Sequence, residues 1–196
     1  MKKFTATHRI IHWVIAISMF VLLATGFLRM YWMGRKTISA AINNELAAKG
    51  LELPEESVRA IAKSIINPMF EWHINFAYVL VFAFVLRIIY MLVKGIKFPN
   101  PFSKTASGKE KFQGTIYFIF YILVAVEAAT GMMLKFELAG ENILEKAEEI
   151  HKLAIYWMPG FIVLHFVGIT IAEFTNKKGI VSKMIEIGRA SCRERV

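Results

Sequence analysis

The sequence predicts an all-α integral membrane protein, a bundle of four transmembrane helices. Of its 196 residues, 56% are hydrophobic, which is above the roughly 45–50% that is usual in a soluble domain. Four apolar segments each approach the roughly 20 residues that a helix needs to cross the hydrocarbon core. None of these segments alternates apolar and polar residues as a half-buried strand does.

The four predicted spans belong to one membrane domain, residues 1–185. They cover about residues 10–33, 69–93, 112–134 and 153–174. The first apolar run is too long for the core of a signal peptide, and no small-residue cleavage site follows it. We therefore expect the first run to remain in the membrane as a span.

Positive charge predicts the orientation of the spans. The formal net charge is +9, and cytoplasmic loops carry the excess of lysine and arginine in membrane proteins. The basic residues gather before the first span, between the second and third, and after the fourth: Lys2, Lys3, Arg9, Lys94, Lys97, Lys104, Lys109, Lys111, Lys177, Lys178 and Lys183. Both termini and the middle connection are therefore predicted to be cytoplasmic. Because these lysines flank spans and no basic-aromatic motif accompanies them, nucleic acid is not expected as a partner.

The outer connection, residues 34–68, contains a predicted short amphipathic helix. It begins after Pro54-Glu55-Glu56, a favourable helix start, and apolar residues then recur at helical spacing. The apolar residues are Val58, Ile61, Ala62, Ile65 and Ile66. This helix is expected to lie on the outer membrane surface, where it either caps the bundle or docks a partner.

Four histidines lie in the apolar segments, where a polar ring must find a partner. Charge-based topology puts His12 and His165 toward the cytoplasm, and it puts His73 and His151 toward the outside. His151 and His165 are 14 residues apart. On one straight helix this spacing gives nearly the same face and a separation of roughly 21 Å along the axis. The histidines therefore sort into an outer pair, His73 with His151, and an inner pair, His12 with His165.

Two histidines that face each other across a helix bundle can be the axial ligands of one haem iron. Filling both axial positions leaves no open site for oxygen or substrate, which favours electron transfer. A zinc site would need three or four ligands at one depth. A lone membrane histidine usually just bonds a neighbouring helix, but two matched layers predict two haems. His8, one turn before His12, is the alternative inner ligand.

Glycines recur at the level of the outer histidines. Gly26 follows His12 by 14 residues, and the Ala-Thr-Gly sequence at residues 24–26 recurs at residues 129–131. Gly26 and Gly131 would let a flat ring approach closely. The alternative is ordinary packing of small residues between membrane helices.

Three further residues of the spans are unusual. Arg87 follows His73 by 14 residues, and it would either pair with a haem propionate or extend to the lipid headgroups. Glu127 is an acidic residue inside a membrane span, where such residues usually have a function, although the sequence identifies no partner for it. Pro159, between His151 and His165, should kink the fourth span.

Residues 186–196 differ in character from the rest of the chain and resemble a translated sequencing adapter, so we treat them as an artefact. The alternative is a genuine basic tail. They include Cys192, the single cysteine. Without it no thiol ligand remains, which excludes iron–sulfur clusters and haem attached through C-x-x-C-H.

The chain resembles the bacterial cytochrome b561 family, and within it the di-haem b-type cytochrome subunits of nickel–iron hydrogenases and formate dehydrogenases. The resemblance covers about residues 5–185. It rests on Arg9-x-x-His12-Trp13, the Ala-Thr-Gly end of the first span, His73, Arg87, the histidine pair of the fourth span and the ending at residues 178–185. The family often has glycine one turn after the histidine of the second span, where this chain has Ala77.

The resemblance implies two b haems in the bacterial cytoplasmic (inner) membrane, and electron transfer between a quinone and a periplasmic redox partner. It also implies a quinone near the inner haem. Gln113, in the segment Lys111–Thr115 that opens the third span, is the candidate for a hydrogen bond to the quinone. The plainer interpretation of Gln113 is a surface amide at a helix start.

Three functions are compatible with these features. The leading hypothesis is an electron-transfer subunit of an oxidoreductase complex, which relays electrons between the quinone pool and a periplasmic subunit or soluble redox protein. The second is a stand-alone superoxide:quinone oxidoreductase of the same family. The acidic stretch from Glu137 to Glu149 disfavours an anionic substrate there, although Arg35 and Lys36 weaken this argument. The third is a haem-free anchor or transporter with Glu127 and Arg87 as an ion relay.

Overall fold

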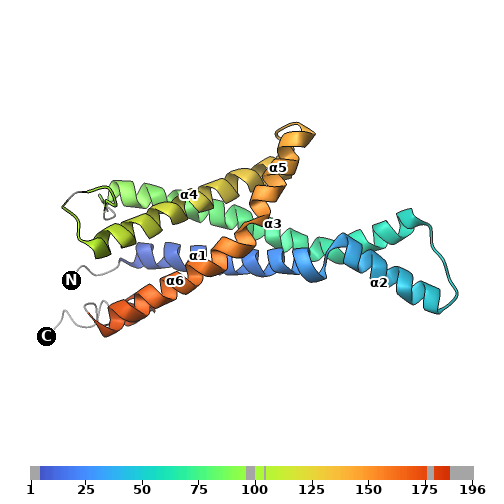
Figure 1. The fold of residues 1–196 in the computed structure, drawn as a ribbon, viewed down its shortest axis with the longest axis horizontal. Coiled ribbons are helices and arrows are strands. Elements are labelled where there is room, and N and C mark those ends of the chain that lie inside the picture. Colours follow the sequence, from blue (N-terminus) through green and yellow to red (C-terminus); the bar gives the residue numbers. More distant parts are fainter. Residues whose placement is uncertain (1–4, 96–99, 104, 176–178, 186–196) are drawn as a thin grey trace. The chain divides into compact units, whose positions relative to one another are not determined.

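The computed structural model describes residues 5–95, 100–103, 105–175 and 179–185. These residues form helices and short connections, with no strand among them. In chain order the helices are α1 (Ala6–Phe27), the π-helix η1 (Leu28–Trp32), α2 (Arg35–Ala48), α3 (Glu55–Val93), α4 (Gly108–Phe136), α5 (Glu141–Lys152), α6 (Ala154–Phe174) and α7 (Ile180–Ile185) (Figure 1). The predicted all-α class is confirmed, and the adapter-like tail lies outside the described residues.

Within the described residues, four helical segments are long and apolar enough to cross a membrane, as the sequence predicts: Ala6–Trp32, Glu55–Val93, Gly108–Phe136 and Glu141–Phe174. Many of their large apolar side chains face outward. Phe20, Phe82 and Phe166 are 68%, 67% and 63% exposed. Because exposing apolar surface to water costs roughly 25 cal/mol per Å², surfaces of this kind are suited to contact with lipid.

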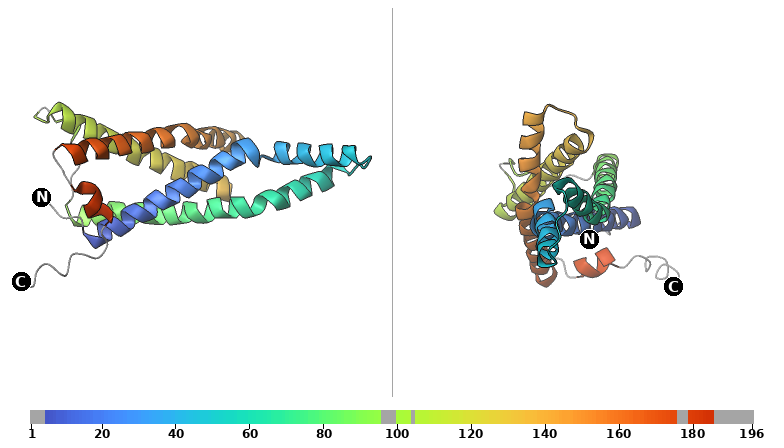
Figure 2. Two further views of the ribbon diagram at one scale, coloured as in Figure 1. Left: turned by 90° about the horizontal axis from the view of Figure 1, so that it is seen from below. Right: turned by 90° about the vertical axis from the view of Figure 1, so that its right-hand side faces the viewer.

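The chain divides into two compact units, Ala16–Leu80 and the combination of Met1–Ile15 with Val81–Val196. In the first unit, α2 and the beginning of α3 form a helical hairpin (Figures 1 and 2). Its core includes a buried row on α3 formed by Val58, Ala62 and Ile66. Residues four apart lie on one helix face, so these three residues realise part of the predicted amphipathic pattern, whereas Ile61 and Ile65 are exposed.

The amphipathic segment is not a separate surface helix, and this detail of the prediction needs correction. It is the first part of α3, which continues through Pro68 to Val93. At 1.5 Å per residue, the 39 residues of α3 extend roughly 58 Å, about twice the thickness of the hydrocarbon core. About half of α3 therefore projects beyond that core, and α2, which the sequence did not predict, runs back along it.

In the second unit, α4 begins at a capping box. The Ser107 hydroxyl accepts from the Glu110 N–H at 3.3 Å, and the Glu110 carboxylate accepts from the Ser107 N–H at 2.9 Å. These reciprocal bonds satisfy donors that a helix start leaves open. The helix ends at Glu137, whose φ of 50° is left-handed. The chain then reverses, and α5 packs against α4.

The fourth predicted span, residues 153–174, corresponds to α6, but the chain turns immediately before it. The Leu153 N–H bonds to the carbonyl of Ile150 at 3.0 Å, and α6 leaves at an angle to α5 (Figure 1). His151 therefore lies on α5 and His165 on α6, so the straight-helix projection of this pair does not hold. The turn comes before Pro159, which lies inside α6.

The short helix α7 lies beside the start of α1 (Figure 2). The Glu173 carboxylate holds the preceding turn, since it accepts from the N–H of Gly179 at 2.7 Å and of Val181 at 3.2 Å. The indole N–H of Trp13 donates to the carbonyl of Met184 at 3.2 Å. These bonds tie the end of the described chain to the turn that carries His12.

Candidate functional site

The inner histidines, His12 of α1 and His165 of α6, come together within the second unit. Their ring centroids are 6.0 Å apart and the rings are tilted by 42°. Phe161, one turn before His165, stacks on it with centroids 5.8 Å apart. A metal–nitrogen bond of about 2 Å on each side puts two imidazoles of one metal at a centroid separation of this size. Pro159 does not separate the pair.

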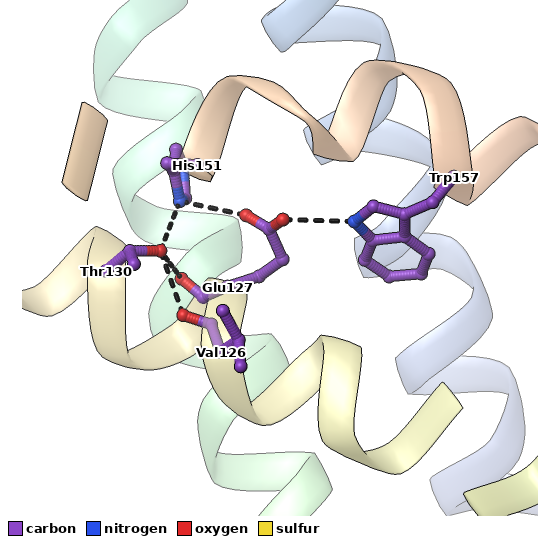
Figure 3. Close-up of polar contacts among 5 residues, drawn as sticks. All are labelled: Val126, Glu127, Thr130, His151 and Trp157. Carbon is purple, nitrogen blue, oxygen red and sulfur yellow. Dashed lines mark hydrogen bonds and ion pairs between the residues drawn. The ribbon is translucent and has the colours of Figure 1, made fainter. Parts of the chain in front are cut away.

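The outer histidine His151 lies at the centre of a polar cluster between α4, α5 and α6 (Figure 3). Its Nδ1 atom is 3.1 Å from the Thr130 hydroxyl and 3.0 Å from Oε2 of Glu127. The other carboxylate oxygen of Glu127 accepts from the indole N–H of Trp157 at 3.0 Å. Three helices thus contribute one imidazole, one hydroxyl, one carboxylate and one indole to a single site.

The hydroxyl of Thr130 and the carboxylate of Glu127 favour one tautomer of His151. Thr130 Oγ1 donates to the carbonyls of Val126 at 2.9 Å and Glu127 at 3.2 Å. When the single proton of the hydroxyl goes to one of these carbonyls, the hydroxyl accepts at Nδ1. The carboxylate of Glu127, 3.0 Å from Nδ1, can only accept there, so the arrangement favours the tautomer with the hydrogen on Nδ1.

Gly131, next to Thr130, leaves room for this imidazole. A Cβ atom at residue 131 would lie 3.1 Å from Cε1 of His151. That distance is shorter than the usual carbon contact of roughly 3.5–4.0 Å, so any side chain here would push against the ring. Gly131 was predicted to let a flat ring approach closely, and in this structure the ring beside it is the imidazole of His151.

His73, the other outer histidine, lies in the first unit and has a matching neighbour. Thr25 of α1 donates to the carbonyls of Val21 at 2.7 Å and Leu22 at 3.1 Å, and its oxygen is 2.8 Å from Nδ1 of His73. As at His151, this arrangement favours the tautomer of His73 with the hydrogen on Nδ1. Phe70 stacks against the ring at a centroid separation of 6.1 Å.

The two threonines are functional candidates that the sequence analysis missed. Both belong to the recurring Ala-Thr-Gly sequence, in which only the glycines were expected to have a role. The recurrence of the sequence could have identified the threonines. Each copy lies toward the predicted outer side of its span, where the outer histidines also lie. In contrast to Gly131, Gly26 is not crowded, since an added Cβ would meet no described atom within 4 Å.

Arg87 lies against the alternative ligand His8 in the second unit. Its guanidinium is 2.9 Å from Nδ1 and 3.2 Å from Nε2 of His8, and it donates to the hydroxyl of Tyr121 at 3.4 Å. His8 is therefore engaged with a cation, whereas the neighbouring His12 ring faces His165. The geometry favours His12 over His8 as the partner of His165.

Gln113, the residue expected to contact quinone, is half-buried in the second turn of α4, next to the buried Gly114. This location agrees with both interpretations of the residue, a quinone contact and an amide near a helix start.

The family model described as prokaryotic cytochrome b561 matches residues 3–186 of this chain. The chain belongs to the prokaryotic cytochrome b561 family. The resemblance read from the sequence is thereby confirmed at the level of the family. No curated protein and no solved structure matches the chain significantly.

Membership in the prokaryotic cytochrome b561 family implies b-type haem, electron transfer and a multi-pass bacterial membrane protein. The residues present fit such a group. Imidazole suits iron, and His73 and His151 each have Nδ1 within hydrogen-bond distance of a threonine hydroxyl. This engagement of the second ring nitrogen is usual for histidines that bind metals.

Proposed function

We propose that this cytochrome b561 is a di-haem membrane electron relay. His12 and His165 would hold an inner haem b, and His73 and His151 would hold an outer one. The observation that carries the proposal is the approach of His12 and His165, from two different spans, to a ring separation of 6.0 Å. In a family that binds haem, such a pair supports axial ligation from both sides.

The outer pair is supported by what each histidine has around it. His73 in its unit and His151 in the other have the same arrangement, a threonine hydroxyl at Nδ1. A shared arrangement of this kind favours a shared role, the binding of iron through Nε2. When bound, haem supplies the one-electron chemistry, while the histidines hold the iron six-coordinate and tune its potential.

The remaining residues support a path for electrons between the two membrane faces. Gln113, near the start of α4 on the predicted cytoplasmic side, would bond the quinone, and Arg87 would bind an inner propionate. On the predicted outer side, the hairpin of α2 and α3 would project beyond the hydrocarbon core. It offers a surface for a periplasmic oxidoreductase subunit or a soluble redox protein.

Haem analysis of the purified chain tests this proposal, with His8 as the control. We expect two haems b per chain, one haem after His12→Ala or His165→Ala, and two after His8→Ala. A single haem in the unmodified protein would contradict the proposal. Loss of a haem in His8→Ala, with two retained in His12→Ala, would transfer the inner ligand to His8.

A second measurement separates the relay from the stand-alone enzyme. A relay subunit needs its redox partner, so the purified chain should reduce quinone only slowly when superoxide is the sole donor. Rapid quinone reduction under these conditions would instead support the superoxide:quinone oxidoreductase.

A further inference from the structure

Glu127 is a carboxylate inside a membrane span, where an ionisable group is costly unless it is paired. Its side chain is 12% exposed, and one of its oxygens accepts from the indole N–H of Trp157 at 3.0 Å. The indole thereby fixes the carboxylate in one orientation. In that orientation the second oxygen, Oε2, points at the imidazole of His151 (Figure 3).

Oε2 of Glu127 is a buried acceptor that makes no hydrogen bond within the described residues. It lies 3.0 Å from Nδ1 of His151, but the ring is aligned toward the Thr130 hydroxyl instead. A buried acceptor without a donor is unfavourable. A small rotation of the imidazole would direct its N–H to Oε2, and Thr130 would still bond its own backbone carbonyls.

The two Ala-Thr-Gly sequences give an internal comparison. Three residues before the threonine, α4 has Glu127 and α1 has Leu22. The residues at and beside the threonine are otherwise the same in the two copies. The carboxylate is therefore an addition to the motif in α4, at the position one turn before the hydroxyl that contacts the histidine.

We propose that Glu127 is a positioning residue that accepts the Nδ1–H of His151 and makes this imidazole the more electron-donating ligand of the outer haem. This inference rests on the proposed function. A carboxylate bonded to the remote ring nitrogen raises the basicity of a metal-bound histidine, which stabilises the oxidised metal. The outer haem would therefore have a lower reduction potential than its two histidines alone would give.

The test compares Glu127→Gln with Glu148→Gln in the full chain loaded with haem. Glu148 lies one turn before His151 on α5, its exposed carboxylate pairs with Lys152 at 2.7 Å, and its replacement makes the same change in charge. Redox titration of Glu127→Gln should give one raised midpoint potential and one unchanged. Glu148→Gln should leave both potentials at their original values. Two unchanged potentials in a Glu127→Gln protein that retains both haems would overturn the inference.

The unmodified protein provides a readout that does not depend on a variant. In the EPR spectrum of the oxidised protein, the outer haem should have a smaller spread of low-spin g values than the inner haem, because that spread narrows as an imidazole becomes more anionic. The signal of the outer haem is identified as the one that disappears from the spectrum of His151→Ala. An equal or larger spread in that signal would also overturn the inference. A preparation with fewer than two haems would instead contradict the proposed function.

Discussion

The Ala-Thr-Gly sequences at residues 24–26 of α1 and 129–131 of α4 use their threonines alike and their glycines differently. Each threonine donates to carbonyls of its own helix and presents its oxygen to Nδ1 of a histidine. Only Gly131 has an imidazole against it, 3.1 Å from the position of an added Cβ, whereas nothing described lies within 4 Å of such an atom at Gly26.

This difference separates two tasks that the motif combines. The threonine contacts Nδ1 of a histidine while it bonds to carbonyls of its own helix. The glycine makes space, and what occupies that space differs between the copies. At residue 131 the occupant is His151 itself, and at residue 26 the space is open to the haem that we propose.

The largest effect is expected from filling the space at Gly131. A valine in Gly131→Val would collide with Cε1 of His151 and displace the ring, so the outer haem should be lost and about one haem should remain. Gly168→Val in α6 is the matched control, because a Cβ there meets no described atom within 4 Å. Haem content per chain measures both variants, and two haems in Gly131→Val would show that the contact is unimportant.

Smaller effects are expected from removing the two acceptors at Nδ1 of His151, the Thr130 hydroxyl and the Glu127 carboxylate, first singly and then together. Thr130→Val leaves Glu127 Oε2 near Nδ1, so the outer haem should remain. The double variant Thr130→Val with Glu127→Leu leaves the N–H without either acceptor, which costs about 1–3 kcal/mol. The affinity for the outer haem should then fall by more than the two single changes together predict. A haem-binding titration of the four proteins measures this coupling, and additive effects would argue against shared use of the two acceptors.

At His73 the matching change is Thr25→Val. Loss of the hydroxyl removes the 2.8 Å contact with Nδ1, at a cost of about 1 kcal/mol. Outer-haem affinity should therefore fall roughly fivefold, with the inner haem unaffected. Unchanged affinity for both haems would mean that Thr25 serves only helix packing.

The smallest effect is expected at Gly26. Alanine is intrinsically favoured over glycine in a helix by roughly 0.5–1 kcal/mol, and the haem-free chain has room for the added methyl group. Gly26→Ala should therefore slightly raise the thermal stability of the haem-free protein and lower its haem affinity. Higher stability with unchanged haem affinity would show that the haem does not use this space.

The sequence predicted the features that depend on composition and local pattern. Four long apolar helices and the amphipathic face with Val58 and Ala62 follow from periodicity alone. The turn at Leu153, between α5 and α6, did not, because no proline or glycine occupies that position. The sequence drew attention to Pro159 instead, and α6 continues through it.

At the candidate site, single residues were identified more readily than their contacts. His12 and His165 were paired by depth, and the structure brings their rings together. Glu127 was recognised as unusual, but its contacts with His151 and Trp157 depend on how three helices pack. The threonines were overlooked because a hydroxyl in a membrane helix usually bonds only its own backbone, which Thr25 and Thr130 also do.

The pairing of His73 with His151 on one outer haem is the central claim, and EPR spectroscopy of the oxidised protein tests it most directly. The unmodified chain should give two low-spin bis-histidine signals. His73→Ala and His151→Ala should each remove the same signal and leave the other intact. If the two variants remove different signals, or if only one of them has an effect, the outer pair is contradicted.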